Sequence, residues 1–210
     1  MTTKSSLSRK KILDASSAVF AEDGFAGARV DVIAQRAGVN KAMLYYHVGD
    51  KRALYGEVLK RNFGRIEKAL EEGMPNEGSA SDRLRAVITI VECAVAANPD
   101  HPRIVLREFA SGAANLPAEI LHRMLGLLTI VRDILADGTE SGEFRRTDPV
   151  MTHLSFIGAI LMLSVVSPLR ERIENLGPSI DFPDPDTDVA RFLGDLLLEG
   201  LAAPRSGESV

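Results

Sequence analysis

The chain has 210 residues, of which 45% are hydrophobic and 26% are charged, close to the averages of soluble globular domains. This composition provides enough apolar side chains for one large domain or two unequal ones, and it excludes extensive disorder away from the chain ends. The single cysteine, Cys93, excludes an internal disulfide, and the absence of a secretory leader predicts a cytoplasmic protein.

The net charge of −4 is distributed unevenly along the chain. Residues 1–65 contain 12 basic and 6 acidic side chains, whereas residues 66–210 contain 13 basic and 23 acidic ones. Such asymmetry is typical of a protein in which one part touches a polyanion and the other part has a different task. Taken alone, the basic residues could equally form a solvated face.

Helical spacing of apolar residues recurs along the chain, and no segment shows the alternation typical of a β-strand. We expect the first helix to follow Ser8 as its N-cap and to end near Gly24, which can adopt the left-handed backbone of a C-terminal cap. Asn40 and Asp50 each stand before a predicted helix and can cap it. The first four helices are expected over about fourteen residues after Ser8 and at about 29–37, 41–47 and 51–72.

Longer and more apolar helices are expected beyond a loop at 73–78. Pro117 and Pro149 suit a first helical turn, where the missing N–H costs little. Pro99 and Pro168 mark helix ends, because the residue before a proline disfavours helical geometry. Five further helices are therefore expected at about 81–97, 102–111, 117–136, 149–167 and 187–201, with a loop at 177–185.

The segment 149–169 contains no Asp, Glu, Lys or Arg, and about twenty apolar residues are enough to span a membrane. However, Thr152, His153 and Ser155 dilute its apolar character, and no second segment of this kind exists. We therefore interpret it as a helix that is buried on most sides.

The region from 28 to 54 has the pattern of a helix-turn-helix. Val30, Ile33 and Ala34 share one face of the first short helix, Gly38 lies in the turn, and Leu44 is an apolar position on the second helix. Two short helices joined by a turn with glycine form such a unit. The second helix of the unit enters the DNA major groove, which is about 12 Å wide.

The outward side chains of this second helix suit DNA recognition. Lys41 can donate to guanine, and Ala42 or Met43 can contact a thymine methyl group. Tyr45 and the backbone amides near residue 51 can hold phosphates. The alternative is an ordinary helical corner with its tyrosines packed inside. The predicted DNA-binding residues are Arg29, Asn40, Lys41, Ala42, Met43, Tyr45, Tyr46, His47 and Lys51.

In these residues the sequence resembles the TetR family of repressors. The matching segments are Ile33–Val39, Lys41, Leu44–His47, Lys51 and Ala53–Leu54, and the resemblance covers roughly residues 8–60. It implies an all-α protein of about nine helices, with an N-terminal three-helix DNA-binding domain and a C-terminal helical domain for ligand binding and dimerisation. It further implies that Lys41–Met43 and His47 contact bases or the groove, and that Tyr45 and Lys51 contact phosphates. The expected domains are 1–49 for DNA binding, 50–203 for ligand binding and dimerisation, and a disordered tail at 204–210.

Two positions depart from the family pattern. Ala28 and Arg29 stand where members commonly carry Thr or Ser, so the hydroxyl cap of the second helix is missing and Arg29 is expected to reach a phosphate instead. Val48 stands where many members carry phenylalanine. The contact map implied by the family is therefore approximate for this chain.

The last two predicted helices carry more apolar residues than one small domain can cover. Pairing them across a two-fold axis would give a four-helix interface between two copies of the chain. The predicted dimer interface consists of Phe156, Ile160, Leu163, Phe192, Leu193, Leu196 and Leu197.

A ligand pocket is expected between the middle helices, although simple core packing is the alternative for each residue assigned to it. The chain has no tryptophan and has no tyrosine after Tyr55, which favours a small apolar or amphipathic ligand over a planar dye. The predicted ligand-binding residues are Phe63, Val91, Glu108, Phe109, His122, Met124, Leu125, Leu128, His153 and Phe156.

These features together predict a homodimeric transcriptional repressor that a small ligand releases from a pseudo-palindromic double-stranded operator. A helical carrier or adaptor whose basic end docks an acidic protein is the alternative that the charge gradient allows. No phosphate loop, nucleophile elbow or metal-site spacing is present, so we expect no enzymatic activity, no cofactor and no metal.

Overall fold

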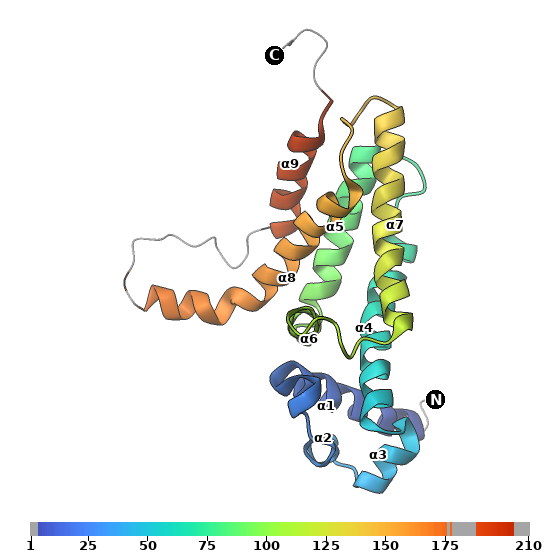
Figure 1. Ribbon diagram of the computed structural model, residues 1–210, viewed down its shortest axis with the longest axis vertical. Helices are drawn as coiled ribbons and strands as arrows, with labels where there is room; N and C mark the ends of the chain where they lie inside the picture. The colour runs from blue at the N-terminus through green and yellow to red at the C-terminus, as the bar shows by residue number, and fades with distance from the viewer. Residues whose placement is uncertain (1–3, 176, 178–187, 204–210) are drawn as a thin grey trace. The chain divides into compact units, whose positions relative to one another are not determined.

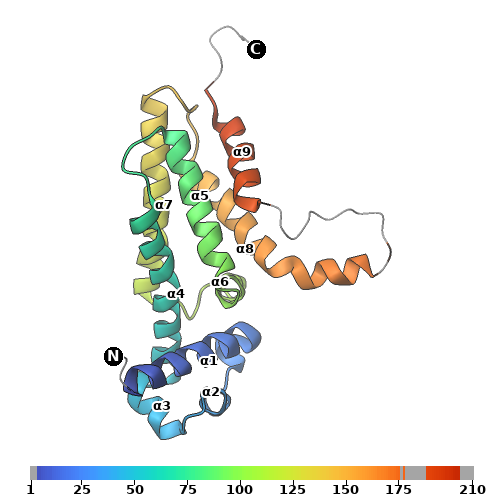
Figure 2. The ribbon, with the colours of Figure 1, turned by 180° about the vertical axis from the view of Figure 1, so that it is seen from behind.

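The computed structural model describes residues 4–175, 177 and 188–203. Within these residues it contains nine α-helices and no β-strand, which confirms the predicted fold class (Figures 1 and 2). An isolated antiparallel bridge joins Phe144 to Ala202. The helices are α1 (Lys4–Gly27), α2 (Val30–Ala37), α3 (Lys41–Val48), α4 (Lys51–Gly73), α5 (Ala80–Ala96), α6 (Asp100–Ala110), α7 (Ala118–Glu140), α8 (Pro149–Glu174) and α9 (Val189–Leu201).

The chain forms two compact units. Unit 1 comprises the described residues up to Arg65 together with Asn98–Arg123, and unit 2 comprises Ile66–Ala97 together with the described residues from Met124 onward. Unit 1 therefore contains α1, α2, α3 and α6 with the first parts of α4 and α7. The predicted domain boundary after residue 49 does not coincide with the boundary between these units, and it stays a prediction.

The predicted helix caps before α3 and α4 are confirmed. The Asn40 side chain accepts a hydrogen bond of 2.7 Å from the Met43 amide, and the Asp50 side chain accepts one of 2.8 Å from the Ala53 amide. The predicted cap at Ser8 is wrong, because α1 begins at Lys4. No glycine or proline between Lys4 and Ser8 stops the helix from extending further toward the N-terminus.

The predicted helix end near Gly24 is present only as a break within α1, and the predicted left-handed cap is wrong because the ψ angle of Gly24 is extended. Gly24 has a φ of 68° and a ψ of 177°, a conformation that a glycine adopts at little cost. The chain then continues as one more helical turn to Gly27, and the Ala28 amide donates to the Gly24 carbonyl at 3.1 Å.

The predicted end of α8 at Ser167 is wrong. The helix continues past Pro168 to Glu174, and its ribbon changes direction along its course (Figures 1 and 2). The nitrogen of Pro168 carries no hydrogen to donate to the carbonyl four residues earlier, which bends a helix without necessarily ending it. Helix α7 also extends beyond its predicted end, to Glu140.

Some predictions fall outside the described residues. These are the start of the last helix at Thr187, most of the loop at 177–185, and the tail at 204–210. Within the described part, α9 begins at Val189, and the Asp188 side chain caps it by accepting from the Arg191 amide at 2.8 Å.

Each unit has its own apolar core. In unit 1, the buried ring of Tyr55 packs edge-on against Phe20 at 4.8 Å and lies 5.1 Å from Phe25, measured between ring centroids. In unit 2, α5, α8 and α9 pack against one another. The buried residues of that second core include Leu84, Ile88, Val131, Ile134, Phe144, Phe156, Ile160 and Leu193.

Candidate nucleic-acid interface

Helices α2 and α3 form the predicted helix-turn-helix. Gly38 occupies the left-handed region between them, with a φ of 66° and a ψ of 34°, and its amide donates to the Gln35 carbonyl at 3.1 Å. The Val39 amide donates to the Ala34 carbonyl at 3.0 Å, which closes the end of α2. Ile33 and Leu44 are fully buried and fix the two helices to the core of unit 1.

Helix α3 divides into a buried side and an exposed side. Leu44 and Val48 face the core, while Lys41, Ala42 and Met43 are exposed at the start of the helix. The exposed side therefore presents one charged and two small or flexible apolar side chains, a set that can read base edges and thymine methyl groups.

Two tyrosines lie on the surface of α3, and the alternative of a corner with both rings inside is wrong. The side chain of Tyr46 is 87% exposed and that of Tyr45 is 43% exposed. His47 is half-buried, and its ring lies edge-on to that of Tyr46 at 5.4 Å. Tyr55, in contrast, is 2% exposed and belongs to the core.

Arg29 stands at the N-cap of α2, where no side chain caps the helix. Its guanidinium instead forms an ion pair with the exposed carboxylate of Asp31 at 2.8 Å. The hydrogen bond from Arg29 lowers the pKa of Asp31. Because both partners are exposed, this pair is weak enough for a phosphate to compete with it.

Lys51, a predicted phosphate contact, has partners within its own chain. Its ammonium donates to the carbonyl of Ala26 at 3.1 Å and lies 4.9 Å from the centroid of the Phe25 ring. An ammonium has three N–H donors, so two remain for other acceptors.

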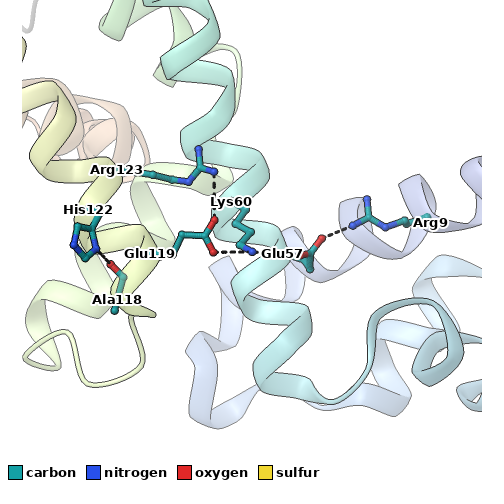
Figure 3. Close-up of polar contacts among 7 residues, drawn as sticks. All are labelled: Arg9, Glu57, Lys60, Ala118, Glu119, His122 and Arg123. Carbon is teal, nitrogen blue, oxygen red and sulfur yellow. Dashed lines mark hydrogen bonds and ion pairs between the residues drawn. The ribbon is translucent and has the colours of Figure 1, made fainter.

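Ion pairs on the surface of unit 1 join α4 to α1 and to α7 (Figure 3). Arg9 pairs with Glu57, and Lys60 pairs with Glu119 at 2.7 Å, while Arg123 reaches the same carboxylate at 3.4 Å. The hydrogen bond to Glu119 raises the pKa of Lys60, and the bond from Lys60 lowers the pKa of Glu119. These exposed pairs orient the helices but contribute little free energy each.

The predicted ligand-binding residues fall into both units, and four of them lie in unit 1. The buried carboxylate of Glu108 accepts hydrogen bonds from the Tyr55 hydroxyl at 2.8 Å and from the backbone and side-chain amides of Asn115, both at 3.3 Å. Phe63 is half-buried, Phe109 is 43% exposed, and His122 is exposed, with Nδ1 2.8 Å from the Ala118 carbonyl (Figure 3).

Six predicted ligand-binding residues lie in unit 2. Val91 and Phe156 are buried in its core, while Met124 and Leu128 are half-buried and Leu125 is 56% exposed. The half-buried ring of His153 lies edge-on to that of Phe156, and its Nδ1 has no hydrogen-bond partner within the described residues. Burial lowers the pKa of His153.

A hollow of about 390 Å³ in unit 2 lies elsewhere, and none of the predicted ligand-binding residues lines it. It is lined by Arg132, Leu135, Ala136, Thr139, Glu140, Arg146, Thr147 and Pro149. Within the described residues, no cluster of three or more His, Cys, Asp and Glu side chains could hold a metal ion.

The predicted dimer interface combines residues buried in the core of their own chain with residues on its surface, and the prediction is wrong for the buried ones. Phe156, Ile160 and Leu193 are at most 6% exposed and lie in the core of their own chain, so they have no surface left for a partner. Leu197 is half-buried. Leu163, Phe192 and Leu196 are exposed, and so are their apolar neighbours Val150, Met151, Leu154, Met162 and Leu169.

The expectation that α8 is buried on most sides is also wrong within one chain. Among the described helices, α8 alone is long and apolar enough to cross a membrane, over Pro149–Val166, and 22% of that window is buried. Its exposed apolar face therefore needs either a partner or a lipid environment.

Sequence reasoning missed two sets of polar contacts in unit 1. Arg36 of α2 forms a two-pronged ion pair with Glu22 of α1, at 2.7 and 2.8 Å. Arg107 of α6 donates to the carbonyls of Ala21 and Glu22 at 3.1 and 2.7 Å. These partners are far apart in sequence, and a charged residue on a helix carries no local sign of its partner.

The fold and the exposed reading face together define a class: an all-helical DNA-binding regulator with a helix-turn-helix. Residues 12–58 match the family profile described as "Bacterial regulatory proteins, tetR family", and residues 77–164 match the one described as "Tetracyclin repressor-like, C-terminal domain". The chain belongs to the TetR family and is a DNA-binding transcriptional regulator.

Named relatives agree with this assignment. The repressor NicS of Pseudomonas putida is 26% identical over 195 residues, which cover 92% of each chain. The fatty acid metabolism regulator protein of Bacillus subtilis is 27% identical over 135 residues, 64% of this chain and 70% of the relative. The crystal structure of FadR from Bacillus subtilis in complex with stearoyl-CoA has a TM-score of 0.68 at 23% identity and covers 95% of this chain and 99% of that one.

Proposed function

We propose that the protein is a homodimeric repressor that binds a pseudo-palindromic operator and leaves it when a small ligand binds. The observation that carries this proposal is the division of α3, in which Leu44 is fully buried while Tyr46 is 87% exposed beside Lys41 and Met43. A short helix fixed on one side and solvated on the other can enter a major groove without rearrangement.

The predicted DNA-binding residues have two roles, reading base edges and positioning the protein on the phosphates. Lys41, Ala42 and Met43 read base edges, and Tyr46 and His47 extend this reading surface. Arg29, Asn40, Tyr45 and Lys51 position the unit on phosphates or hold the start of α3 in place.

The exposed apolar face of α8 and α9 is the surface on which we place the second copy of the chain. Leu163, Phe192 and Leu196 carry over from the sequence prediction, and Met151, Leu154 and Met162 join them. Two copies give two reading heads, which is why we expect the operator to be pseudo-palindromic, with half-sites one helical turn apart or a multiple of it. A dimer in solution also favours the cytoplasm over a membrane for this protein.

The ligand is proposed to be apolar or amphipathic. The predicted ligand-binding residues are mostly aliphatic or phenylalanine, and a relative of the same fold has been crystallised with stearoyl-CoA. A ligand that binds better to one position of α4 than to another shifts the population of that position, and the reading heads leave the spacing that the operator requires.

The test is a reporter assay combined with a binding assay. The protein is expected to reduce transcription from a promoter that overlaps its binding site. In fluorescence anisotropy, stearoyl-CoA is expected to weaken binding to the same duplex, whereas free coenzyme A, which lacks the acyl chain, is not. Increased transcription in the reporter, or equal effects of the two compounds, would contradict the repressor and ligand assignments respectively.

A further inference from the structure

The C-terminal segment of α1, residues 21–27, lies directly before the helix-turn-helix formed by α2 and α3, which is called the reading element below. Only Ala28 and Arg29 separate Gly27 from the first residue of α2. A displacement of residues 21–27 therefore moves α2. Because the turn at Gly38 packs α3 against α2, the same displacement also moves α3. The contacts that hold residues 21–27 accordingly decide where the reading helix stands.

The segment 21–27 contains a break in the helix. At Gly24 the backbone is non-helical, and carbonyls next to such a break lose regular partners and need donors from elsewhere. Arg107 of α6 provides these donors: its Nε lies 3.1 Å from the carbonyl oxygen of Ala21, and its Nη2 lies 2.7 Å from that of Glu22. A Cβ built at Gly24 would lie 3.8 Å from the Cδ of Arg107, so the arginine stem packs beside the break.

The charge of Arg107 also matches its position. A cation near the last carbonyls of a helix interacts favourably with the negative end of the helix dipole. The guanidinium is planar and presents several N–H groups in a fixed fork, so it holds two successive carbonyls in one geometry. Glu22 is tied at the same time to Arg36 of α2, which links the α6 contact to the reading element itself.

We propose that Arg107 is a positioning residue for DNA binding: from α6 it fixes the C-terminal segment of α1, residues 21–27, and thereby the placement of α2 and α3. The proposal rests on the DNA-binding function argued above. Arg107 is exposed, so direct contact with a phosphate is the competing explanation, and salt dependence separates the two.

The experiment uses the full-length protein and a duplex that the wild type enriches from a random-sequence pool. Arg107→Met keeps most of the aliphatic stem and removes both hydrogen bonds. We expect it to weaken binding to the enriched duplex about tenfold, since two charge-assisted bonds are lost, while the slope of log affinity against log salt stays as in the wild type. Arg107→Lys restores a cation and one donor group and is expected to recover part of the loss.

Arg103→Met is the matched control. Arg103 lies one turn earlier on α6, is exposed, and makes no hydrogen bond or ion pair in the described part of the chain. The pKa of Glu22 is lowered mainly by its hydrogen bond from Arg36, and the nearby charge of Arg103 contributes, so this variant tests the loss of a charge near Glu22 without the loss of the bonds to the α1 carbonyls. The Arg103→Met variant removes the same charge as Arg107→Met, and we expect it to bind DNA like the wild type.

Three results would overturn the proposal. They are unchanged binding by Arg107→Met, an equal loss in Arg103→Met, and a salt slope reduced by about one, which would make Arg107 a phosphate contact. If Arg107→Met does not fold, as judged by circular dichroism, Arg107→Lys carries the same comparison. If the wild type enriches no duplex, the DNA-binding function fails and not the role of Arg107.

Discussion

Tyr55→Phe isolates a single buried hydrogen bond. The Tyr55 hydroxyl donates to Glu108 Oε1 at 2.8 Å, and the ring keeps its contacts with Phe20 and Phe25 when only the oxygen is removed. A hydrogen bond to a charged group contributes about 1.5–3 kcal/mol. Glu108 retains its two bonds from Asn115, so we expect the free energy of unfolding to fall by about 2 kcal/mol.

The assay is chemical denaturation followed by circular dichroism at pH 7. Tyr46→Phe is the matched control, because its ring is 87% exposed and should change the free energy of unfolding by less than about 0.5 kcal/mol. Equal stabilities of the two variants would refute the claim that the Tyr55–Glu108 bond stabilises unit 1.

The pH dependence of the Tyr55 contact has a definite sign. Burial, together with the hydrogen bond to Glu108, raises the pKa of Tyr55 above its ordinary value of 10.0. The stabilisation is fully present below pH 10 and declines as the pH rises further, because the unfolded chain loses the phenol proton first. The difference in stability between wild type and Tyr55→Phe should therefore shrink above pH 10.

Three further predictions concern separate parts of the chain. Burial lowers the pKa of His101 from 6.5 to about 4, so the wild type should lose up to about 3 kcal/mol of stability between pH 6.5 and pH 4, and urea titrations should show less of this loss for His101→Leu. Lys51→Met should reduce the salt slope of DNA binding by about one, because Lys51 is assigned to a phosphate, whereas Met43→Ala should change the preferred base pair and leave the slope unchanged; anisotropy titrations that find the same slope for both would contradict these roles. Phe192→Asp should convert the dimer to a monomer in light scattering, because an unpaired carboxylate is costly to bury, while Glu199→Gln on the same helix should remain dimeric.

Local chemistry explains which parts of the fold could be predicted. Asn40 and Asp50 cap their helices with side chains that bond to amides three residues later, so both partners are visible in a short stretch of sequence. Ser8 has the same capping chemistry, yet it lies inside α1, because a residue that can cap a helix does not have to end it. The prediction that α8 ends before Pro168 was wrong for a similar reason, since a helix can bend at a proline and continue.

The faces of α8 and α9 could not be assigned from spacing alone. Phe156 and Met151 are both apolar, but the first is 0% and the second 64% exposed in the single chain. Periodicity identifies an apolar residue without telling whether its own chain or another molecule covers it. The contact between Arg107 and Ala21 spans 86 positions in sequence, and only the folded chain brings such partners together.

Selection from a random pool tests most directly whether α3 reads duplex DNA by sequence. Full-length wild type at low salt is incubated with random duplexes, and bound molecules are sequenced after several rounds. We expect the wild type to enrich a pseudo-palindromic site, and we expect the Lys41→Met and Met43→Ala variants to enrich that site less or to enrich a different sequence. A folded wild-type protein that enriches no sequence over the starting pool would contradict this expectation.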